Sequence, residues 1–310
     1  MSQKYRLITR SDLDGITCAA ILREAGLVDE VTFAHPKDMQ DGTIEVTVND
    51  IITNLPHHPN AHLVFDHHAS EIERNKVQPK NVINDPKAPS AAQVVFEHLG
   101  GYAKLPNISK ELMDAANKID SAQLSEAEIL NPQGWVLLGF IMDNRTGLGR
   151  LHQFKISNYQ LMLELIDIFR THKTIEDILK SPNVAERVKV YKEHAEQARH
   201  QIKKCGTRHE KLLVIDLRKE TVIYCINRFA IYALYPDINI SMHILPGKQN
   251  ANTVFAVGKS VLNRSSKVDV GSLMLKYGGG GHKAVGTCQL AHDKVDVVKA
   301  ELIEQIVKAG

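Results

Sequence analysis

The chain has 310 residues, enough for about two domains of ordinary size, and 43% of its residues are apolar. Its formal net charge is only +2, which argues against a stable partnership with a long nucleic acid but leaves room for a small anionic substrate at a local basic site. The four cysteines form no CxxC pair, and neither a signal peptide nor an apolar run long enough to span a membrane is evident. We therefore expect a soluble, cytoplasmic protein without a membrane partner.

The first half of the chain alternates short apolar runs with helical patterns. The predicted strands cover 5–9, 30–34, 44–48 and 62–65, and the predicted helices cover 14–27 and 90–99. Ser90 is the expected N-cap of the second helix. Helical patterns then dominate from about 109 to 156. Strands that alternate with helices favour an α/β fold with a largely parallel sheet flanked by helices.

The second half begins with a long amphipathic segment. Apolar residues recur at spacings of four and three from Val184 to Ile202, which predicts a connector helix, although a surface helix of the first domain fits the pattern equally well. The elements expected beyond it are strands over 211–216, 221–226, 238–245 and 253–257 and a final helix over 293–309. The predicted organisation is a domain over 1–180, a connector helix over 181–204 and a smaller α/β domain over 205–310.

Carboxylates and imidazoles gather at the ends of predicted elements in the first domain. They are Asp12 and Asp14 after the first strand, Asp50 after the third, Asp66-His67-His68 after the fourth, and Asp120 within the helical region. Such groups are costly to bury unless something binds them, and ligands of open sheets gather at the carboxyl ends of strands. Carboxylates mixed with imidazole suit Mn²⁺ or Mg²⁺, and two such ions roughly 4 Å apart can activate water for attack on phosphorus.

The second domain contains one further unusual string, four consecutive glycines from Gly278 to Gly281 followed by His282. Glycine exposes backbone N–H groups that suit a phosphate, and His282 can add a donor. Arg264 is a candidate for a fork-like phosphate contact. The alternative interpretation of the glycine run is a flexible hinge.

Together these motifs, in this order over nearly the whole chain, resemble the DHH family of phosphoesterases with its DHH-associated C-terminal domain, which includes nanoRNases and RecJ exonucleases. The resemblance implies that Asp12 and Asp14 each bind one metal ion and that Asp50 bridges both. It also implies that His67 binds metal, that His68 lies close to the scissile phosphate, and that Asp66 orients a histidine.

The resemblance assigns further residues and shows two departures. Asp120 matches the fourth-motif aspartate in its RecJ version, and Asp143 matches the nanoRNase version as the alternative. The expected substrate contacts in the second domain are Arg264, Gly280, Gly281 and His282. Many family members carry a histidine where this chain has Ile8, and Gly286 follows His282 after three residues where the family usually has four.

The implied function is that of a metal-dependent phosphodiesterase, with two Mn²⁺ ions or with Mg²⁺, that hydrolyses short linear oligonucleotides or dinucleotides such as pGpG to 5′-mononucleotides. One alternative is a hydrolase of polyphosphate or pyrophosphate, against which the glycine-rich second domain argues. Another is a catalytically impaired nucleotide-binding protein, which Ile8 would favour. The sequence leaves a homodimer open.

Overall fold

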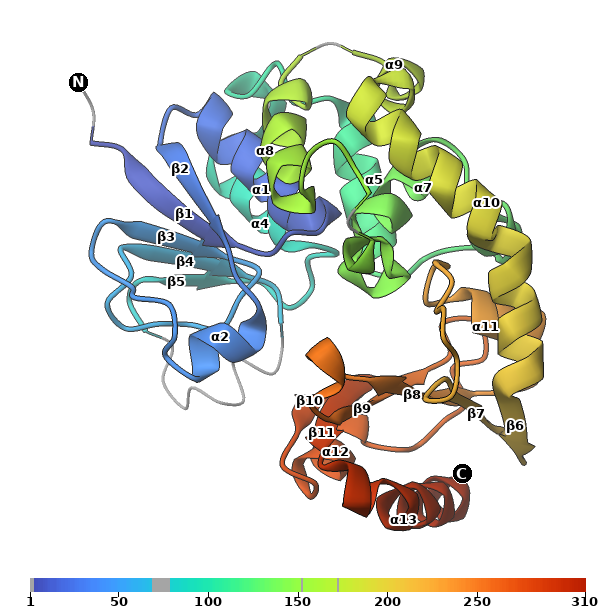
Figure 1. Cartoon of the computed structure of the whole chain (residues 1–310). Coiled ribbons are helices and arrows are strands. Elements are labelled where there is room, and N and C mark those ends of the chain that lie inside the picture. Colours follow the sequence, from blue (N-terminus) through green and yellow to red (C-terminus); the bar gives the residue numbers. More distant parts are fainter. Residues whose placement is uncertain (1–2, 69–78, 152, 172) are drawn as a thin grey trace. The chain divides into compact units, whose positions relative to one another are not determined.

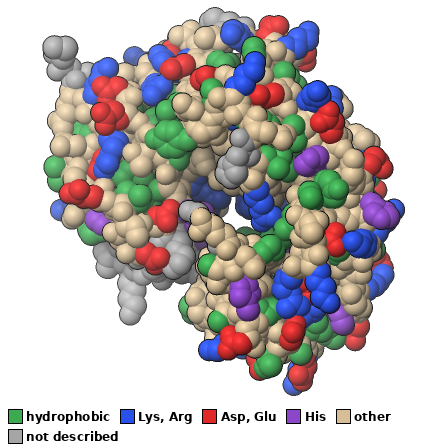
Figure 2. Space-filling view, in the orientation of Figure 1, with side chains coloured by type: hydrophobic (Ala, Val, Ile, Leu, Met, Phe, Trp, Pro, Cys, Tyr) green, Lys and Arg blue, Asp and Glu red, His purple; other side chains and the backbone are tan. Residues whose placement is uncertain are grey.

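The computed structural model describes residues 3–68, 79–151, 153–171 and 173–310. These form two compact units, the first from Met1–Leu124 and Pro132–Val190 and the second from Ser125–Asn131 and Tyr191–Gly310 (Figure 1). The division falls inside the long helix α10 (Pro182–Cys205) rather than at either of its ends. Within the described ranges, no helix is long and apolar enough to cross a membrane. Acidic and basic side chains are interspersed over the face shown in Figure 2, in keeping with the small net charge.

The first unit is built on a parallel sheet whose described strands run in the order β2-β1-β3-β4-β5. The strands are β1 (Tyr5–Thr9), β2 (Val28–Phe33), β3 (Asp50–Thr53), β4 (Leu63–Asp66) and β5 (Val82–Asn84). From β1 the chain builds outwards to β2 on one side and to β3 on the other. This reversal is where open α/β sheets bind ligands, beyond the carboxyl ends of the strands.

Helices cover this sheet and confirm the predicted α/β class (Figure 1). They are α1 (Leu13–Glu24), α2 (Pro36–Gln40), α4 (Ala91–His98), α5 (Lys110–Asp120), α7 (Gly134–Met142), α8 (Asn158–Ile168) and α9 (Ile175–Lys180), with short 3₁₀ turns η1 (Gly101–Ala103), η2 (Asn144–Thr146) and η3 (Leu148–Arg150). Ser90 caps α4 as predicted, since its hydroxyl accepts a hydrogen bond from Gln93 N at 3.0 Å.

Successive residues of the central strands serve two different cores. Leu7, Ile51 and Phe65 pack in the large cluster formed with α1, α4, α5 and α8. Their neighbours Ile8 and Ile52 lie in a smaller cluster on the other face. Ile8 is therefore a buried core residue, 0% exposed, and it contributes packing rather than a metal ligand.

The strand predicted over 44–48 is wrong, because the third strand of the sheet begins only at Asp50. Ile44, Val46 and Val48 alternate with polar residues as a strand would, but Val46 packs as a loop residue on the smaller core and Val48 is 69% exposed. An interior strand of a parallel sheet is buried on both faces and has a continuous apolar run, which Ile51 and Ile52 provide. Asp50 consequently lies at the amino end of its strand.

The second unit contains a mixed sheet in the order β10-β11-β9-β8-β7-β6, in which only β7 and β8 pair in parallel among the described strands. The strands are β6 (Gly206–His209), β7 (Leu212–Asp216), β8 (Ile240–Pro246), β9 (Thr253–Lys259), β10 (Gly280–His282) and β11 (Val285–Leu290). The helices are α6 (Glu126–Leu130), α11 (Ala230–Leu234), α12 (Val270–Leu275) and α13 (Val295–Ala309), with 3₁₀ turns η4 (Lys248–Asn250) and η5 (His292–Lys294). Side chains of α12 and α13 complete the core of this sheet.

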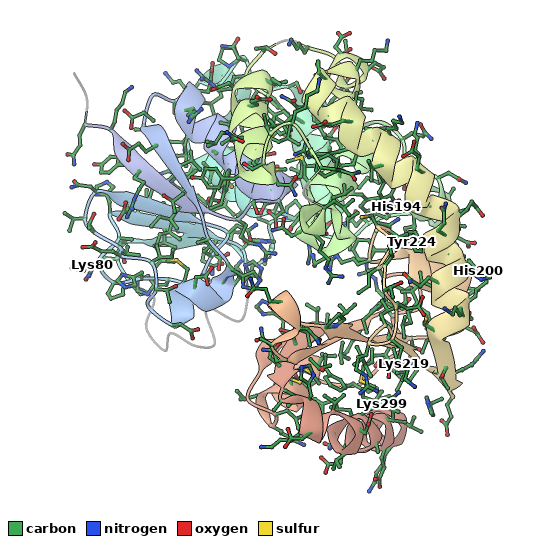
Figure 3. All side chains as sticks on the ribbon, viewed as in Figure 1. Lys80, His194, His200, Lys219, Tyr224 and Lys299 are labelled. Atoms are coloured by element: carbon green, nitrogen blue, oxygen red, sulfur yellow. The ribbon has the colours of Figure 1, made fainter. Side chains whose placement is uncertain are left out.

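The segment 221–226 was predicted as a strand, and this prediction is wrong. Its backbone bonds to side chains of α10 instead: Tyr224 N donates to Gln201 Oε1 and Cys225 N donates to His194 Nδ1, both at 3.1 Å. His194 and Tyr224 also pack edge to face, with ring centroids 5.3 Å apart (Figure 3). Helix α10 therefore supplies the partners that a neighbouring strand would otherwise have supplied.

Candidate metal centre

The Asp66-His67-His68 tripeptide begins at the last residue of β4, where the buried strand reaches the edge of the sheet. Asp66 is 2% exposed and its Oδ1 lies 2.7 Å from Nδ1 of His68. The predicted contact between Asp66 and a neighbouring histidine is therefore present. It fixes the orientation of the His68 ring.

Asp14 lies in the first turn of α1, but its carboxylate also caps a second helix. Oδ2 accepts from Ala91 N at 3.1 Å and Oδ1 from Ala92 N at 2.8 Å, which satisfies two N–H groups at the start of α4. Asp14 is 2% exposed. Because each carboxylate oxygen has two lone pairs, this capping orients the group and still leaves acceptor capacity for a cation.

Asp14, His67 and Asp120 form the one group among the described residues whose ligand atoms could jointly hold a metal ion, with all three atoms within 4.8 Å of one another. His67 Nε2 is buried and lies 3.1 Å from Asp120 Oδ2. Its other ring nitrogen, Nδ1, lies 3.3 Å from the carbonyl oxygen of Ala88. A histidine that donates from Nδ1 and directs Nε2 at two carboxylates fits a divalent cation.

Burial and neighbouring charges shift the pKa values of Asp14, His67 and His68 when no metal is bound. Burial and the nearby Asp120 carboxylate raise the pKa of Asp14 to about 7. Burial lowers the pKa of His67, but the carboxylates of Asp120 and Asp14 outweigh it and raise the value to about 9. Burial also lowers the pKa of His68, and Asp66 outweighs it, so the net pKa is raised. A cation held by Asp14 and His67 would displace protons from these two groups.

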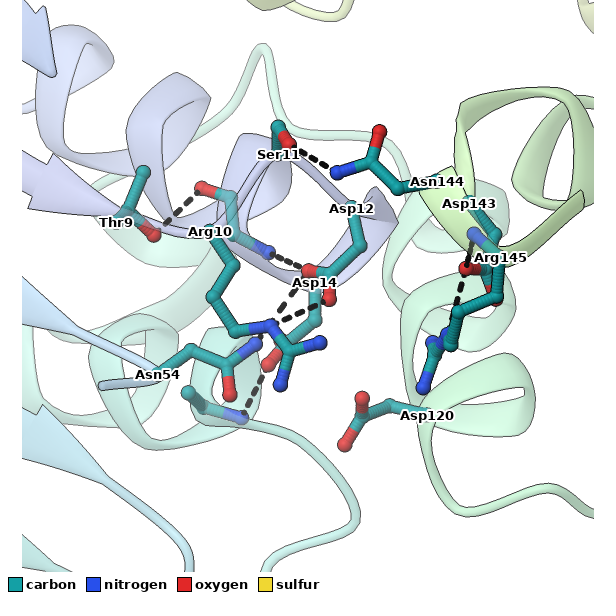
Figure 4. A network of polar contacts seen from close by, with 12 residues as sticks. Thr9, Arg10, Ser11, Asp12, Asp14, Asn54, Asp120, Asp143, Asn144 and Arg145 are labelled. Atoms are coloured by element: carbon teal, nitrogen blue, oxygen red, sulfur yellow. Dashed lines mark hydrogen bonds and ion pairs between the residues drawn. The ribbon is translucent and has the colours of Figure 1, made fainter. Parts of the chain in front are cut away.

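The structure brings Asp120 rather than Asp143 into the cluster. Asp120 is the last residue of α5. Asp143 instead caps the 3₁₀ turn η2 by accepting from Arg145 N at 2.9 Å, and its Oδ1 also pairs with Arg145 Nε at 2.6 Å (Figure 4). Asn144 joins this turn to the site, since its Nδ2 donates to Ser11 Oγ at 3.0 Å.

Asp12 lies near the cluster, but neighbouring side chains and backbone already engage its carboxylate. Its Oδ1 accepts from Gly15 N at 3.1 Å and from Asn54 Nδ2 at 3.4 Å, and Arg10 Nε lies 3.0 Å from its Oδ2 (Figure 4). Asp12 is thus the N-cap of α1 and the partner of a guanidinium. Its expected role as a ligand of a separate metal ion stays a prediction.

The expectation that Asp50 bridges two ions is contradicted by its position. Asp50 is at the amino end of β3, whereas the cluster gathers beyond the carboxyl ends of the strands. Its two oxygens lie 2.7 and 2.8 Å from Nε and Nη2 of Arg6, and Oδ2 accepts from Thr47 N at 2.7 Å. Burial raises the pKa of Asp50, but these partners outweigh it and the net pKa is lowered. The carboxylate therefore stabilises the fold.

Sequence reasoning missed two residues at this edge, Arg10 and Asn54. Arg10 follows β1 directly and Asn54 follows β3, so both lie at the reversal of strand order. Asn54 has a positive φ of 55°, a conformation that asparagine tolerates better than most residues, and its N donates to Phe65 O at 3.1 Å. The available signal for both was their place directly after a strand. For Asn54 this signal can be recognised only once β3 is assigned correctly.

The second part of the glycine string, Gly280–His282, is an edge strand of the described sheet, and Gly278 lies in the turn before it. Gly280, Gly281 and His282 pair antiparallel with β11. Gly281 has a φ of 154°, and a Cβ atom there would lie 2.2 Å from the carbonyl oxygen of Val285. Arg264 lies in the connection between β9 and α12, where its Nε donates to Val261 O at 3.1 Å. Close packing thus explains part of the glycine content, and the substrate contacts stay predictions.

Comparison with known proteins gives one strong likeness. No family model and no curated protein matches the sequence. Among solved structures, the chain is 52% identical to the pGpG-specific phosphodiesterase PggH from Vibrio cholerae, over 99% of this chain and 100% of that one, with a TM-score of 0.82.

Two more distant structures share the fold. RecJ from Thermus thermophilus, solved with Mn²⁺, is 14% identical over 98% of this chain and 52% of its own, with a TM-score of 0.54. CDC45 from Entamoeba histolytica is 9% identical over 97% of this chain and 95% of its own, with a TM-score of 0.52. The 52% identity to PggH over both full lengths shows that this chain belongs to the same family, the DHH phosphoesterases.

Proposed function

We propose that this protein is a metal-dependent phosphodiesterase that hydrolyses pGpG and related linear dinucleotides to 5′-mononucleotides. The observation that carries the proposal is the cluster of Asp14, His67 and Asp120 beside a histidine held by Asp66, in a chain 52% identical to a pGpG-specific phosphodiesterase. In this reaction water adds to phosphorus, the bond from phosphorus to the 3′ oxygen breaks, and pGpG yields two molecules of 5′-GMP.

Asp14, His67 and Asp120 would hold the cation, with Mn²⁺ or Mg²⁺ favoured by the carboxylate-rich donor set. When bound, such an ion polarises a phosphate oxygen and lowers the pKa of water. The chain's own contribution is orientation: Asp14 is tied to α4, and His67 is aligned by the carbonyl of Ala88. The resemblance implied two ions, whereas this ligand set accounts for one.

His68 acts on the substrate. Its Nδ1 is paired with Asp66, whose carboxylate raises the pKa of the ring against the effect of burial. An imidazolium held in this way can donate from Nε2 to a phosphate oxygen as charge develops, or protonate the departing 3′ oxygen. Asp66 serves this role by stabilising the charged ring and fixing its orientation.

Residues of the second unit bind the substrate away from the broken bond. An edge strand presents backbone groups that a ligand can reach, and Gly280 has open space where a Cβ atom would lie, whereas Gly281 packs closely against Gly271 of α12. His282 and Arg264, both exposed, add donors for a phosphate or a base.

The test is a turnover panel of pGpG, a second linear dinucleotide, cyclic di-GMP, a longer oligonucleotide and polyphosphate, each with Mn²⁺ and with Mg²⁺, followed by chromatography. We expect mononucleotides from the linear dinucleotides, and a loss of roughly 100-fold in kcat for His68→Ala. His200→Ala, which removes an exposed histidine of α10 (Figure 3), is the matched control and should retain full activity.

Two results would refute the proposal. If no linear dinucleotide is hydrolysed with either ion, the chain is not a phosphodiesterase of this class. If pGpG binds tightly without turnover and His68→Ala changes nothing, the chain is a nucleotide-binding protein.

A further inference from the structure

The residues after β1 and β3 provide a positive charge where a second cation would need negative ligands. Arg10 Nε lies 3.0 Å from Asp12 Oδ2, with side chains only 26% and 17% exposed. The other oxygen of Asp12, Oδ1, accepts from the neutral amide of Asn54 at 3.4 Å. The carboxylate of Asp50, the other acidic candidate in this region of the sequence, is bound to Arg6 at the far end of the strand.

The balance of charges around the site also argues against a second cation. Asp12 is paired with Arg10, and Asp143 is paired with Arg145. Asp66 is paired with His68, which leaves Asp14 and Asp120 as the carboxylates of the described site with neither an arginine nor His68 as partner. The third ligand, His67, binds metal as a neutral imidazole. Two negative charges balance one divalent cation. A second cation would add two positive charges beside the guanidinium of Arg10, which is unfavourable in a partly buried site.

From these contacts we infer that the centre is mononuclear and that Arg10 takes the place of a second cation, neutralising Asp12 and binding a phosphate oxygen of the substrate. The catalytic part of this inference rests on the proposed function, whereas the metal count does not. A guanidinium carries five N–H donors, so its pairing with Asp12 leaves donors for a phosphate.

The backbone fixes Arg10 in this position. A Cβ atom at residue 15 would lie 2.1 Å from the carbonyl oxygen of Arg10, so the close approach of the two chain segments requires Gly15. Asp12 is held in turn as the N-cap of α1. Arg10 is therefore positioned before the substrate arrives, as a preorganised electrostatic contact requires.

The metal count is measured on the full chain without substrate. The chain is dialysed against Mn²⁺, the bound metal is counted by mass spectrometry, and EPR distinguishes an isolated Mn²⁺ ion from a spin-coupled pair. We expect one isolated ion per chain. Two bound ions, or a spin-coupled pair, would overturn the inference, and so would a chain that binds no Mn²⁺.

Variants test the role of Arg10 itself. The double variant Arg10→Gln with Asn54→Asp removes the competing charge and adds a carboxylate beside Asp12, so we expect it to bind a second ion. Arg10→Ala should keep one ion but lose roughly 100-fold in kcat, the usual effect of deleting one donor to a developing charge. The matched control is Arg23→Ala, at the far end of α1, which breaks an ion pair with Asp167 of α8. It should change neither the number of bound ions nor kcat.

The remaining outcomes are equally informative. A double variant that folds, by circular dichroism, and still binds one ion overturns the assignment of Arg10 and Asn54 as the residues that exclude a second ion. Full activity in Arg10→Ala overturns its contact with the substrate. Because the metal is counted without substrate, a chain that hydrolyses no dinucleotide can still bind a single ion, so the proposed function and this inference fail separately.

Discussion

Replacing Asp50 with asparagine should destabilise the first unit and leave the metal centre intact. Asp50 is 1% exposed and accepts charge-assisted hydrogen bonds from Arg6 at 2.7 and 2.8 Å. Removing one partner of such a pair lowers the free energy of unfolding by about 2–3 kcal/mol. The side chain of Arg6 is 32% exposed, and screening by solvent reduces the expected loss to about 2 kcal/mol. For a unit of this size the corresponding fall in Tm is roughly 4–8 °C.

Thermal unfolding and Mn²⁺ counting on Asp50→Asn test both parts of this expectation. Because the pKa of Asp50 is lowered on folding, its contribution is present above the ordinary carboxyl pKa and is lost as the pH falls. The Tm difference from the unmodified chain should therefore shrink in acid. The control is Asp29→Asn in β2, which removes the exposed partner of Lys4 and should leave Tm nearly unchanged. Loss of metal with an unchanged Tm would show that Asp50 is a ligand and refute the reasoning.

Three further outcomes follow from the geometry. Asp120→Asn should weaken Mn²⁺ binding by about 100-fold in calorimetry, whereas Asp143→Asn should not, because only Asp120 adjoins the buried Nε2 of His67. Since the pKa of His67 is raised to about 9 without metal, Mn²⁺ must displace a proton from its ring. The affinity for Mn²⁺ should therefore rise by up to about tenfold per pH unit from pH 7 to 9. Calorimetry in buffers of different ionisation enthalpy should detect the released proton. Gly281→Ala should destabilise the second unit by about 1–3 kcal/mol in a denaturant titration, because its φ is 154° and a Cβ would overlap the next strand. Gly280→Ala, with open space around it, should not.

Each of these expectations has a clear contrary result. Equal effects of Asp120→Asn and Asp143→Asn would place the cation elsewhere. An affinity for Mn²⁺ that is flat with pH would mean that His67 is not a ligand. A stable Gly281→Ala variant would show that β10 can move away from β11.

The sheet and the tripeptide after β4 could be predicted because both depend on local pattern. Val64 and Phe65 are buried and end in polar residues, which is the signature of an interior strand reaching a ligand site. The same reasoning failed one strand earlier. The alternation of Ile44, Val46 and Val48 looks more like a strand than the short run at Ile51, and only tertiary packing decides between them.

The error at β3 had a direct chemical consequence. A strand placed six residues too early moves Asp50 from the amino end to the carboxyl end of the sheet and turns a structural ion pair into a metal ligand. It also hides Asn54, whose amide meets Asp12 across 42 residues of sequence. Contacts of this kind depend on strand order and backbone turn together, and no spacing in a single sequence encodes them.

Asp14 links the candidate metal centre to the start of helix α4. The same carboxylate that faces His67 and Asp120 also closes the first turn of α4 through Ala91 and Ala92. A change at this position should therefore have two effects, because it removes a proposed metal ligand and frays the first turn of α4. Asp14 is constrained by both requirements, and the first turn of α4 should register the arrival of the cation as slower exchange of its amide protons.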